Sequence, residues 1–318
     1  METIYLTHET AWWYWSNAKS AATTLAIAKR RQVMKDCALS VPAIRALARS
    51  GVFAGQHLSV ATPVRGRRNG EGVTFHYCST QLPRGSYVQL SQTVYVASPE
   101  LSFLQAAAAQ PFWEAVLYGF LLCGSFALDA SSKWGTAPRA PLTSKKKLAA
   151  FLDQCPGQPG VKAARKALRY VLEGSASPRE SKTALLLTLP LCKGGYGIPA
   201  MELNAELLVP EHLRGLAARQ TFRVDFLWRN YGIAGEYDSD AAHLESEERC
   251  SDATKRLALK AMSLEPFEFT KLQVDNVHRM DETVALLRKK MGLRFPQRLP
   301  KDYARRQRQL RSDLGFGA

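Results

Sequence analysis

The segment from Val224 to Asp238, VDFLWRNYGIAGEYD, restricts the fold of this chain more than any other stretch. It reads as two short apolar strands, Arg223–Trp228 and Ile233–Asp238, separated by the loop RNYG. Apolar strands that flank such a short loop are typical of a β-hairpin, and this loop length is common in hairpins. The sequence therefore predicts an antiparallel strand pair in the second half of the chain.

The predicted hairpin carries three acidic residues, although acids are disfavoured in strands. Pairing Trp228 with Ile233 places Asp225 opposite Glu236, with Cβ atoms about 4.5 to 5.5 Å apart on one face of the sheet. Side chains alternate along a strand, so Asp238 shares the face of Glu236. The sequence therefore predicts that the three carboxylates converge.

Like charges that face each other repel, so this arrangement is costly unless a cation or a proton lies among them. Oxygen ligands in a small cluster suit Mg²⁺ or Mn²⁺, which proteins hold through one or two carboxylates together with water and substrate phosphate. Such an ion polarises a phosphoryl oxygen and helps to form hydroxide near neutral pH. Asp225, Glu236 and Asp238 are thus candidate metal ligands for phosphodiester hydrolysis. The alternative is a solvent-exposed hairpin face whose acids pair with Arg223 or Arg229.

Glu180 is a fourth candidate acid, in the segment SASPRESKTALLL. Ser177 reads as a helix N-cap, Pro178 as the first helical residue and Glu180 as the third, which is the pattern of a capping box. That pattern explains Glu180 without a catalytic role, so both interpretations stay open.

A histidine and a polar helix face follow the hairpin. His243 lies five residues after Asp238, where it could assist proton transfer, although a lone histidine is common on surfaces and in cores. Arg249, Asp252 and Arg256 recur at three- and four-residue spacing, which places them on one face of a helix. This face points either at a phosphate group or at water.

The whole sequence predicts an α+β protein with two folded parts. In the first part, residues 9–50 read as helices, 57–97 as strands separated by turn signals, and 98–126 as two apolar helices. In the second part the expected order is helix, strand, strand, helix, strand, helix. The expected boundaries are 1–130 for a helical and β-rich domain, 131–160 for a linker rich in Ser, Pro and Lys, 161–292 for the domain with the hairpin, and 293–318 for a basic tail.

Basic residues outnumber acidic ones by 43 to 28 among 318 residues, which gives a formal net charge of +15. Such a balance favours a polyanionic partner, nucleic acid in particular. Most of the excess lies in the run from Arg288 to Arg311, where Asp302 is the only acid. This run is typical either of phosphate contacts, with Arg305, Arg306 and Arg308 as candidates, or of a solvated tail.

The six cysteines form no CxxC pair and lie at no zinc-finger spacing from a histidine, which indicates reduced core thiols rather than a zinc site. The N-terminus lacks a basic region followed by an apolar run, and no stretch of about eighteen apolar residues occurs. We therefore expect a cytoplasmic protein without a signal peptide or a membrane span.

Several segments of the second half match, in order, the motifs of one protein family. They are ASPRE with Glu180, GGYGIP, RVDFLW with Asp225, GEYDSDAAH, and the helix RCSDATKRLAL. Together they resemble the PD-(D/E)XK nuclease superfamily, and within it the domains related to very-short-patch repair endonucleases. The resemblance covers roughly residues 163–292 and implies a restriction-endonuclease-like core, in which helices flank a central mixed sheet. In that family a helix-borne glutamate and hairpin carboxylates surround Mg²⁺, and the enzyme cuts DNA.

The chain departs from the family pattern at two positions. Asp238 stands where the general superfamily has lysine, as in the repair-endonuclease branch, and His243 is the candidate substitute. Ser239 stands where glycine commonly follows the second acid. The first half resembles the abortive-infection type IV antitoxin family through VASPELSFLQAAA at 96–108 and LYGFLLCGSF at 117–126, which implies kinship of architecture.

We therefore expect a Mg²⁺- or Mn²⁺-dependent DNA endonuclease or nuclease-like protein, acting in DNA repair or phage defence. Asp225, Glu236 and Asp238 would hold the ion, Glu180 would contribute directly or through water, and His243 would assist proton transfer. The alternative is a non-catalytic DNA-binding regulator or antitoxin-like protein that keeps the nuclease fold as a scaffold.

Overall fold

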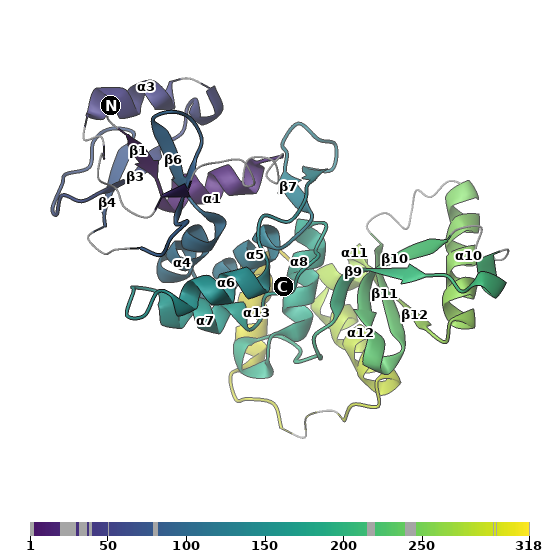
Figure 1. Cartoon of the computed structure of the whole chain (residues 1–318). Coiled ribbons are helices and arrows are strands. Elements are labelled where there is room, and N and C mark those ends of the chain that lie inside the picture. The colour runs from purple at the N-terminus through teal and green to yellow at the C-terminus, as the bar shows by residue number, and fades with distance from the viewer. Residues whose placement is uncertain are drawn as a thin grey trace. The chain divides into compact units, whose positions relative to one another are not determined.

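The computed structural model describes residues 3–19, 30–31, 37, 40–49, 51–78, 82–214, 220–238, 246–294, 296 and 298–317. The chain forms two compact units, Met1–Val171 and Leu172–Ala318, and Figure 1 labels most of their helices and strands. Each unit combines helices with a mixed β-sheet, which confirms the expected α+β character at this level.

The first unit contains a six-stranded sheet with the strand order β2-β5-β6-β1-β3-β4. Its strands are β1 (Ile4–Leu6), β2 (Arg30–Arg31), β3 (Leu58–Thr62), β4 (Val73–Tyr77), β5 (Tyr87–Gln89) and β6 (Val94–Ala97). β1 is parallel to β6 and antiparallel to β3, and β3 is parallel to β4. The strands β1, β3 and β6 are buried along their whole length, so the core of this unit lies around the middle of the sheet.

The helices of the first unit are α1 (His8–Asn17), α3 (Val41–Ala48), α4 (Pro99–Ala109), α5 (Phe112–Leu122), α6 (Lys145–Asp153) and α7 (Val161–Leu168). α4 begins where the sequence suggests, because Pro99 occupies the first turn and the Ser98 side chain accepts a hydrogen bond from the Leu101 amide at 3.2 Å. α4 and α5 are the two apolar helices expected within 98–126.

Residues 131–160 belong to the first unit, which differs from the expected linker. They contain α6 and the strand β8 (Thr136–Pro138), which pairs with β7 (Phe126–Leu128). The Arg139 side chain, only 5% exposed, donates hydrogen bonds to the carbonyls of Trp15 (2.6 Å) and Leu121 (2.8 Å). Composition suggested a linker, but the buried arginine and its main-chain partners fix this segment to the rest of the unit.

The second unit contains a four-stranded mixed sheet with the order β12-β11-β10-β9. Its strands are β9 (Glu202–Leu208), β10 (Thr221–Trp228), β11 (Ile233–Asp238) and β12 (Glu265–Thr270). β10 is antiparallel to both of its neighbours, whereas β11 is parallel to β12. The expected hairpin is confirmed, because Trp228 pairs with Ile233 and Gly232, at φ +60°, completes the turn. The strand β9 was not expected.

The helices of the second unit are α8 (Pro178–Thr188), α10 (Ser246–Ala261), α11 (Lys271–Asp275), α12 (Val277–Lys290) and α13 (Tyr303–Leu314). Leu259 of α10 packs against one face of the sheet, in a core with Leu207, Val224, Leu227 and Ala234. The other face carries an aromatic cluster of Phe226, Trp228, Phe267 and Phe269. Within the described ranges, no helix combines the length and the apolar content that a membrane span requires.

The basic C-terminal segment is a folded part of the second unit rather than a tail. α13 buries Tyr303, Leu310 and Leu314. The Arg311 side chain is fully buried and donates hydrogen bonds to the carbonyls of Val274 (2.7 Å) and Gly317 (2.8 Å). The sequence did not predict this helix, because its many charged residues indicate exposure, whereas Arg311 is buried in the core.

Candidate active site

Asp225 lies at the point where β10 and β11 separate. The ladder between the two strands runs from Trp228↔Ile233 to Phe226↔Gly235. Beyond it, the amide of Tyr237 donates a hydrogen bond of 2.7 Å to Oδ2 of Asp225. Asp225 and Glu236 therefore do not form the direct pair that the sequence predicted. Instead, the Asp225 carboxylate accepts a hydrogen bond from the main chain of β11.

A local irregularity in β10 explains this position. Val224 and Leu227 both belong to the core that contains Leu259 of α10. Regular alternation puts residues three apart on opposite faces, so the alternation shifts by one residue between Val224 and Leu227. Asp225 lies in that interval, where the ladder with β9 is interrupted on both strands but keeps its register, so no residue is inserted as in a β-bulge.

The neighbouring strand β9 has a matching irregularity at Asn204. The ladder between β9 and β10 leaves out Asn204 and Asp225 while pairing the residues on either side of them. Asn204 has φ +50°, in the left-handed region that asparagine tolerates better than most residues. Its side-chain Nδ2 donates a hydrogen bond of 2.5 Å to Oε2 of Glu180. Asn204 therefore connects the irregular part of the sheet to the start of α8.

Glu180 acts at the N-terminus of α8 and faces Asp225. Its amide donates to Oγ of the N-cap Ser177 at 3.1 Å, and its Oε2 accepts from the amide of Ala176 at 3.0 Å. Burial raises the pKa of Glu180, and the negative charge of Asp225 raises it further. The carboxylate therefore has a structural role at the helix start, and it also lies close enough to Asp225 for the two charges to repel.

Asp225 is also perturbed. Burial raises its pKa, while the Tyr237 amide and the positive charge of Lys255 oppose that shift. A buried carboxylate that keeps such partners can bind a proton or a cation more readily than an exposed one.

Lys255 of α10 supplies the positive charge beside these acids. Its Nζ lies 2.7 Å from Oε1 of Glu236 and donates a hydrogen bond of 2.8 Å to the carbonyl of Arg223. Both charged side chains are about three-quarters covered, with 23% of Lys255 and 28% of Glu236 exposed. The adjacent Arg256 is among the residues predicted from the sequence, whereas Lys255 is not. The available signal was its position four residues before the buried Leu259, which places it on the sheet side of the helix.

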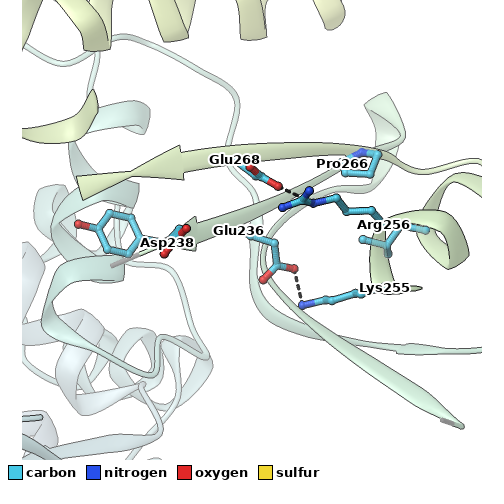
Figure 2. Close-up of a pocket in the computed structure, with 8 residues that line it drawn as sticks. Glu236, Asp238, Lys255, Arg256, Pro266 and Glu268 are labelled. Atoms are coloured by element: carbon cyan, nitrogen blue, oxygen red, sulfur yellow. Dashed lines mark ion pairs between the residues drawn. The ribbon is translucent and has the colours of Figure 1, made fainter. Parts of the chain in front are cut away.

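A pocket of about 180 Å³ opens between β11, β12 and α10. Figure 2 shows Lys255 reaching toward Glu236 and Arg256 reaching toward Glu268, with Asp238 further along β11. The Arg256 Nε lies 2.7 Å from Oε1 of Glu268. The pocket walls thus alternate acidic and basic groups, which suits a ligand with a charged and hydrogen-bonding backbone better than an apolar one.

The residues present fit a divalent cation only in part. In the part of the chain that the structure describes, no three His, Cys, Asp or Glu side chains form a group that could hold a metal ion. Glu236 pairs with Lys255, which leaves Glu180 and Asp225 as the carboxylates whose mutual repulsion a cation would relieve. Two carboxylates are enough for Mg²⁺ when water and substrate phosphate complete its shell.

The other predicted site residues are scattered. His243 and Ser239 lie outside the described residues, as does the side chain of Arg249. Arg305 and Arg306 lie on α13, within 3.5 and 3.6 Å of Asp302. Arg306 also donates a hydrogen bond to the carbonyl of Cys192. Arg308 is exposed on the same helix. These arginines therefore lie on α13, an element separate from the hairpin.

Comparison with known proteins identifies no relative. No protein-family model, curated protein or solved structure matches the chain. The resemblance of residues 163–292 to PD-(D/E)XK nucleases therefore stays a prediction.

Proposed function

We propose that the second unit is a metal-dependent endonuclease that hydrolyses DNA phosphodiester bonds. The observation that carries this proposal is the meeting of Glu180, Asp225 and the Glu236–Lys255 ion pair where β10 and β11 separate. Acids that repel one another, held beside a lysine, are costly for stability alone, so the arrangement favours a chemical role.

The fold and the motifs support the same proposal. A mixed sheet with α10 packed on one face and α11 in contact with β12 resembles the restriction-endonuclease-like core that the sequence motifs imply. The unexpected strand β9 contributes Asn204, which holds the carboxylate of Glu180. In the proposed site the lysine missing from β11 is replaced by Lys255, which reaches the hairpin from α10.

Each residue has a definite proposed task. Glu180 and Asp225 would hold Mg²⁺ or Mn²⁺, an ion that polarises a phosphoryl oxygen and lowers the pKa of bound water. The ammonium group of Lys255 would donate hydrogen bonds to the charge that develops on the phosphoryl oxygens. Glu236 holds that ammonium group in place, and Asp238 forms part of the pocket wall.

The test is cleavage of supercoiled, linear duplex and single-stranded DNA by the full chain in Mg²⁺, in Mn²⁺ and in chelator. We expect metal-dependent cleavage that the Asp225→Asn variant lacks. The matched control is Glu202→Gln, which removes a carboxylate of the same sheet that pairs with Arg229 at 2.7 Å. Cleavage that persists in chelator or in Asp225→Asn would contradict the proposal.

A second candidate function is a DNA-binding regulator without catalytic activity. The observation that favours it is the ion pair itself, because Lys255 neutralises Glu236 and occupies a position that a cation would otherwise share. Calorimetric titration with Mn²⁺, combined with a gel-shift assay, separates the two candidates. DNA binding without metal uptake or strand cutting supports the regulator, whereas metal uptake that Asp225→Asn abolishes supports the nuclease.

A further inference from the structure

A row of arginines and aromatic rings lies along the edge strand β4 of the first unit. β3 and β4 are parallel neighbours, so the chain must return from the end of one to the start of the other. The return segment passes beside β4, where the guanidinium group of Arg65 lies 5.0 Å from the centre of the Tyr77 ring and that of Arg67 lies 4.5 Å from the centre of the Phe75 ring. We call these four residues the arginine–aromatic ladder.

The ladder combines a regular strand with a turn. Phe75 and Tyr77 are two residues apart in β4, so their rings share a face of the strand. Arg65 and Arg67 flank Gly66, which has φ +71°, and each arginine meets one of these rings. The pattern RxR followed by FxY is the sequence signal for this arrangement.

Main-chain contacts hold the return segment in place. Gly70 and Val73 exchange hydrogen bonds of 3.0 and 3.1 Å, and the Phe75 amide donates to Oδ1 of Asn69 at 2.9 Å. Gly72, at φ +73°, makes the turn into β4. Because these bonds use polar groups at the sheet edge, the arginines are presented from a fixed backbone rather than from a free loop.

The ladder lies in a strongly basic segment and is partly exposed. Tyr77 is 43% exposed and Arg65 is exposed, whereas Arg67 and Phe75 are half-buried. The neighbouring Arg68 is exposed as well. The segment from Val64 to Gly72 has Glu71 as its acid, and that side chain lies 3.9 Å from Arg45. The exposed guanidinium group of Arg65 can form bidentate hydrogen bonds with a phosphate while it stacks on Tyr77.

We propose that the arginine–aromatic ladder binds the phosphate backbone of nucleic acid. This surface belongs to the first unit and needs no metal ion, so it goes beyond the proposed nuclease site and does not depend on it. The main rival partner is an anionic membrane. Nucleic acid is favoured because stacked arginines combine planar phosphate recognition with a face on which a base can stack, whereas a membrane surface site needs an apolar stripe.

The test measures fluorescence anisotropy of labelled oligodeoxythymidine and of a labelled duplex with the full chain in chelator, where cleavage cannot contribute. The test variant is Arg65→Gln/Arg67→Gln, and the control is Lys146→Gln/Lys147→Gln, which removes the same charge from exposed positions of α6. We expect the test variant to bind about tenfold more weakly and to reduce the salt slope by about 1.4 for a single strand. The control should change affinity less than about twofold.

Two further variants keep the result interpretable. Arg65→Lys/Arg67→Lys retains the charge but loses the planar fork, so we expect an intermediate affinity. Glu202→Gln, which changes a carboxylate of the second unit outside the proposed site, should bind within about twofold of the wild type. An equal loss in both charge-removing variants would overturn the proposal, as would unchanged binding by the arginine variant. If the arginine variant loses binding to vesicles of anionic phospholipid but keeps its binding to nucleic acid, the surface is a membrane site instead.

Discussion

Two pairs of like titratable groups, one in each unit, show opposite consequences of burial. In the first unit the rings of His8 and His76 stack with centres 3.7 Å apart, and His8 has φ +44°. Burial and then the charge of His76 lower the pKa of His8 to about 4. In the second unit burial and then the charge of Asp225 raise the pKa of Glu180, beside Asn204 at φ +50°. Both pairs lie at strained backbone and are driven toward their neutral forms.

The neighbours of the two pairs make them different. His76 lies 3.6 Å from Glu9, whose carboxylate accepts a hydrogen bond of 2.7 Å from Ser59. A pKa near 4 leaves His8 neutral at pH 7, where it is a packing element. The acid pair instead has Lys255 as a neighbour, and Lys255 lines a pocket. Both pairs therefore have an opposite charge beside them, and the acid pair also adjoins a pocket through Lys255, which is the reason we propose a chemical role for it.

The largest expected effect comes from removing the charge beside the acid pair. Lys255→Met should lower the rate of Mg²⁺-dependent DNA cleavage by about 100- to 1,000-fold, since one preorganised donor to a developing oxyanion contributes that much. Single-turnover cleavage rates check this value. The Lys255→Met substitution should also destabilise the protein by roughly 1 kcal/mol, because Glu236 loses its partner.

The double variant Lys255→Met/Glu236→Gln separates the two effects. It should recover the stability, because no unpaired carboxylate remains, but it should not recover the cleavage rate. Recovery of both would mean that Lys255 serves the fold and not the chemistry.

Arg311 provides a buried charge whose expected role is structural. Arg311→Met should lower the free energy of unfolding by about 3 kcal/mol, because it leaves the buried carbonyl of Val274 without a donor and removes the hydrogen bond to Gly317. The exposed Arg308 on the same helix is the control, and Arg308→Met should have little effect. Urea unfolding monitored by tryptophan fluorescence measures both variants. Similar stabilities for the two would contradict the folded role assigned to residues 298–317.

Lowering the pH should change the stability contributions of the histidine pair and of the acid pair in opposite directions. The pKa of His8 is lowered in the folded state, so its contribution is complete above its ordinary value of 6.5 and is lost as pH falls toward about 4. That loss is at most roughly 3 kcal/mol, from the size of the shift. The pKa of Glu180 and of Asp225 is raised, so the second unit should gain stability as pH falls through their folded values.

Hydrogen exchange resolved by peptide, with intrinsic rates corrected for pH, measures each unit within the whole chain. Between pH 7 and pH 4 the peptides of α1 and β4 should lose protection, and those of α8 and β10 should not. The His8→Asn variant is the control, because asparagine tolerates the left-handed backbone but cannot acquire the charge. If His8→Asn shows the same loss, the stack is not the cause.

Local patterns were sufficient to predict the hairpin and its neighbouring helices. Alternation and a short loop predict the β10–β11 pair, and the cap at Ser177 predicts the start of α8. β9 and α13 were missed for physical reasons. β9 has two acids and an irregular residue, Asn204, so its alternation is weak, and α13 buries an arginine that any pattern based on polarity treats as exposed.

The candidate site was predictable only where its residues lie in one hairpin. Asp225 and Glu236 follow from the register, although the shift in β10 changes how Asp225 is presented. Lys255 and Asn204 come from other elements, and their approach depends on how α10 and β9 pack on the hairpin. Contacts between elements of this kind are set by tertiary packing, which short-range spacing does not encode.

The smallest expected effect tests the turn that sets the register. Gly232 has φ +60°, and a Cβ built there would lie 3.3 Å from the carbonyl oxygen of Ser263. Gly232→Ala should therefore cost about 1 kcal/mol of stability, measured by urea unfolding. The cleavage rate should stay within about twofold of wild type, because the ladder from Trp228 to Phe226 keeps Asp225 in position. A large loss of cleavage at this small cost in stability would show that the turn, rather than the strand pairing, positions the acids.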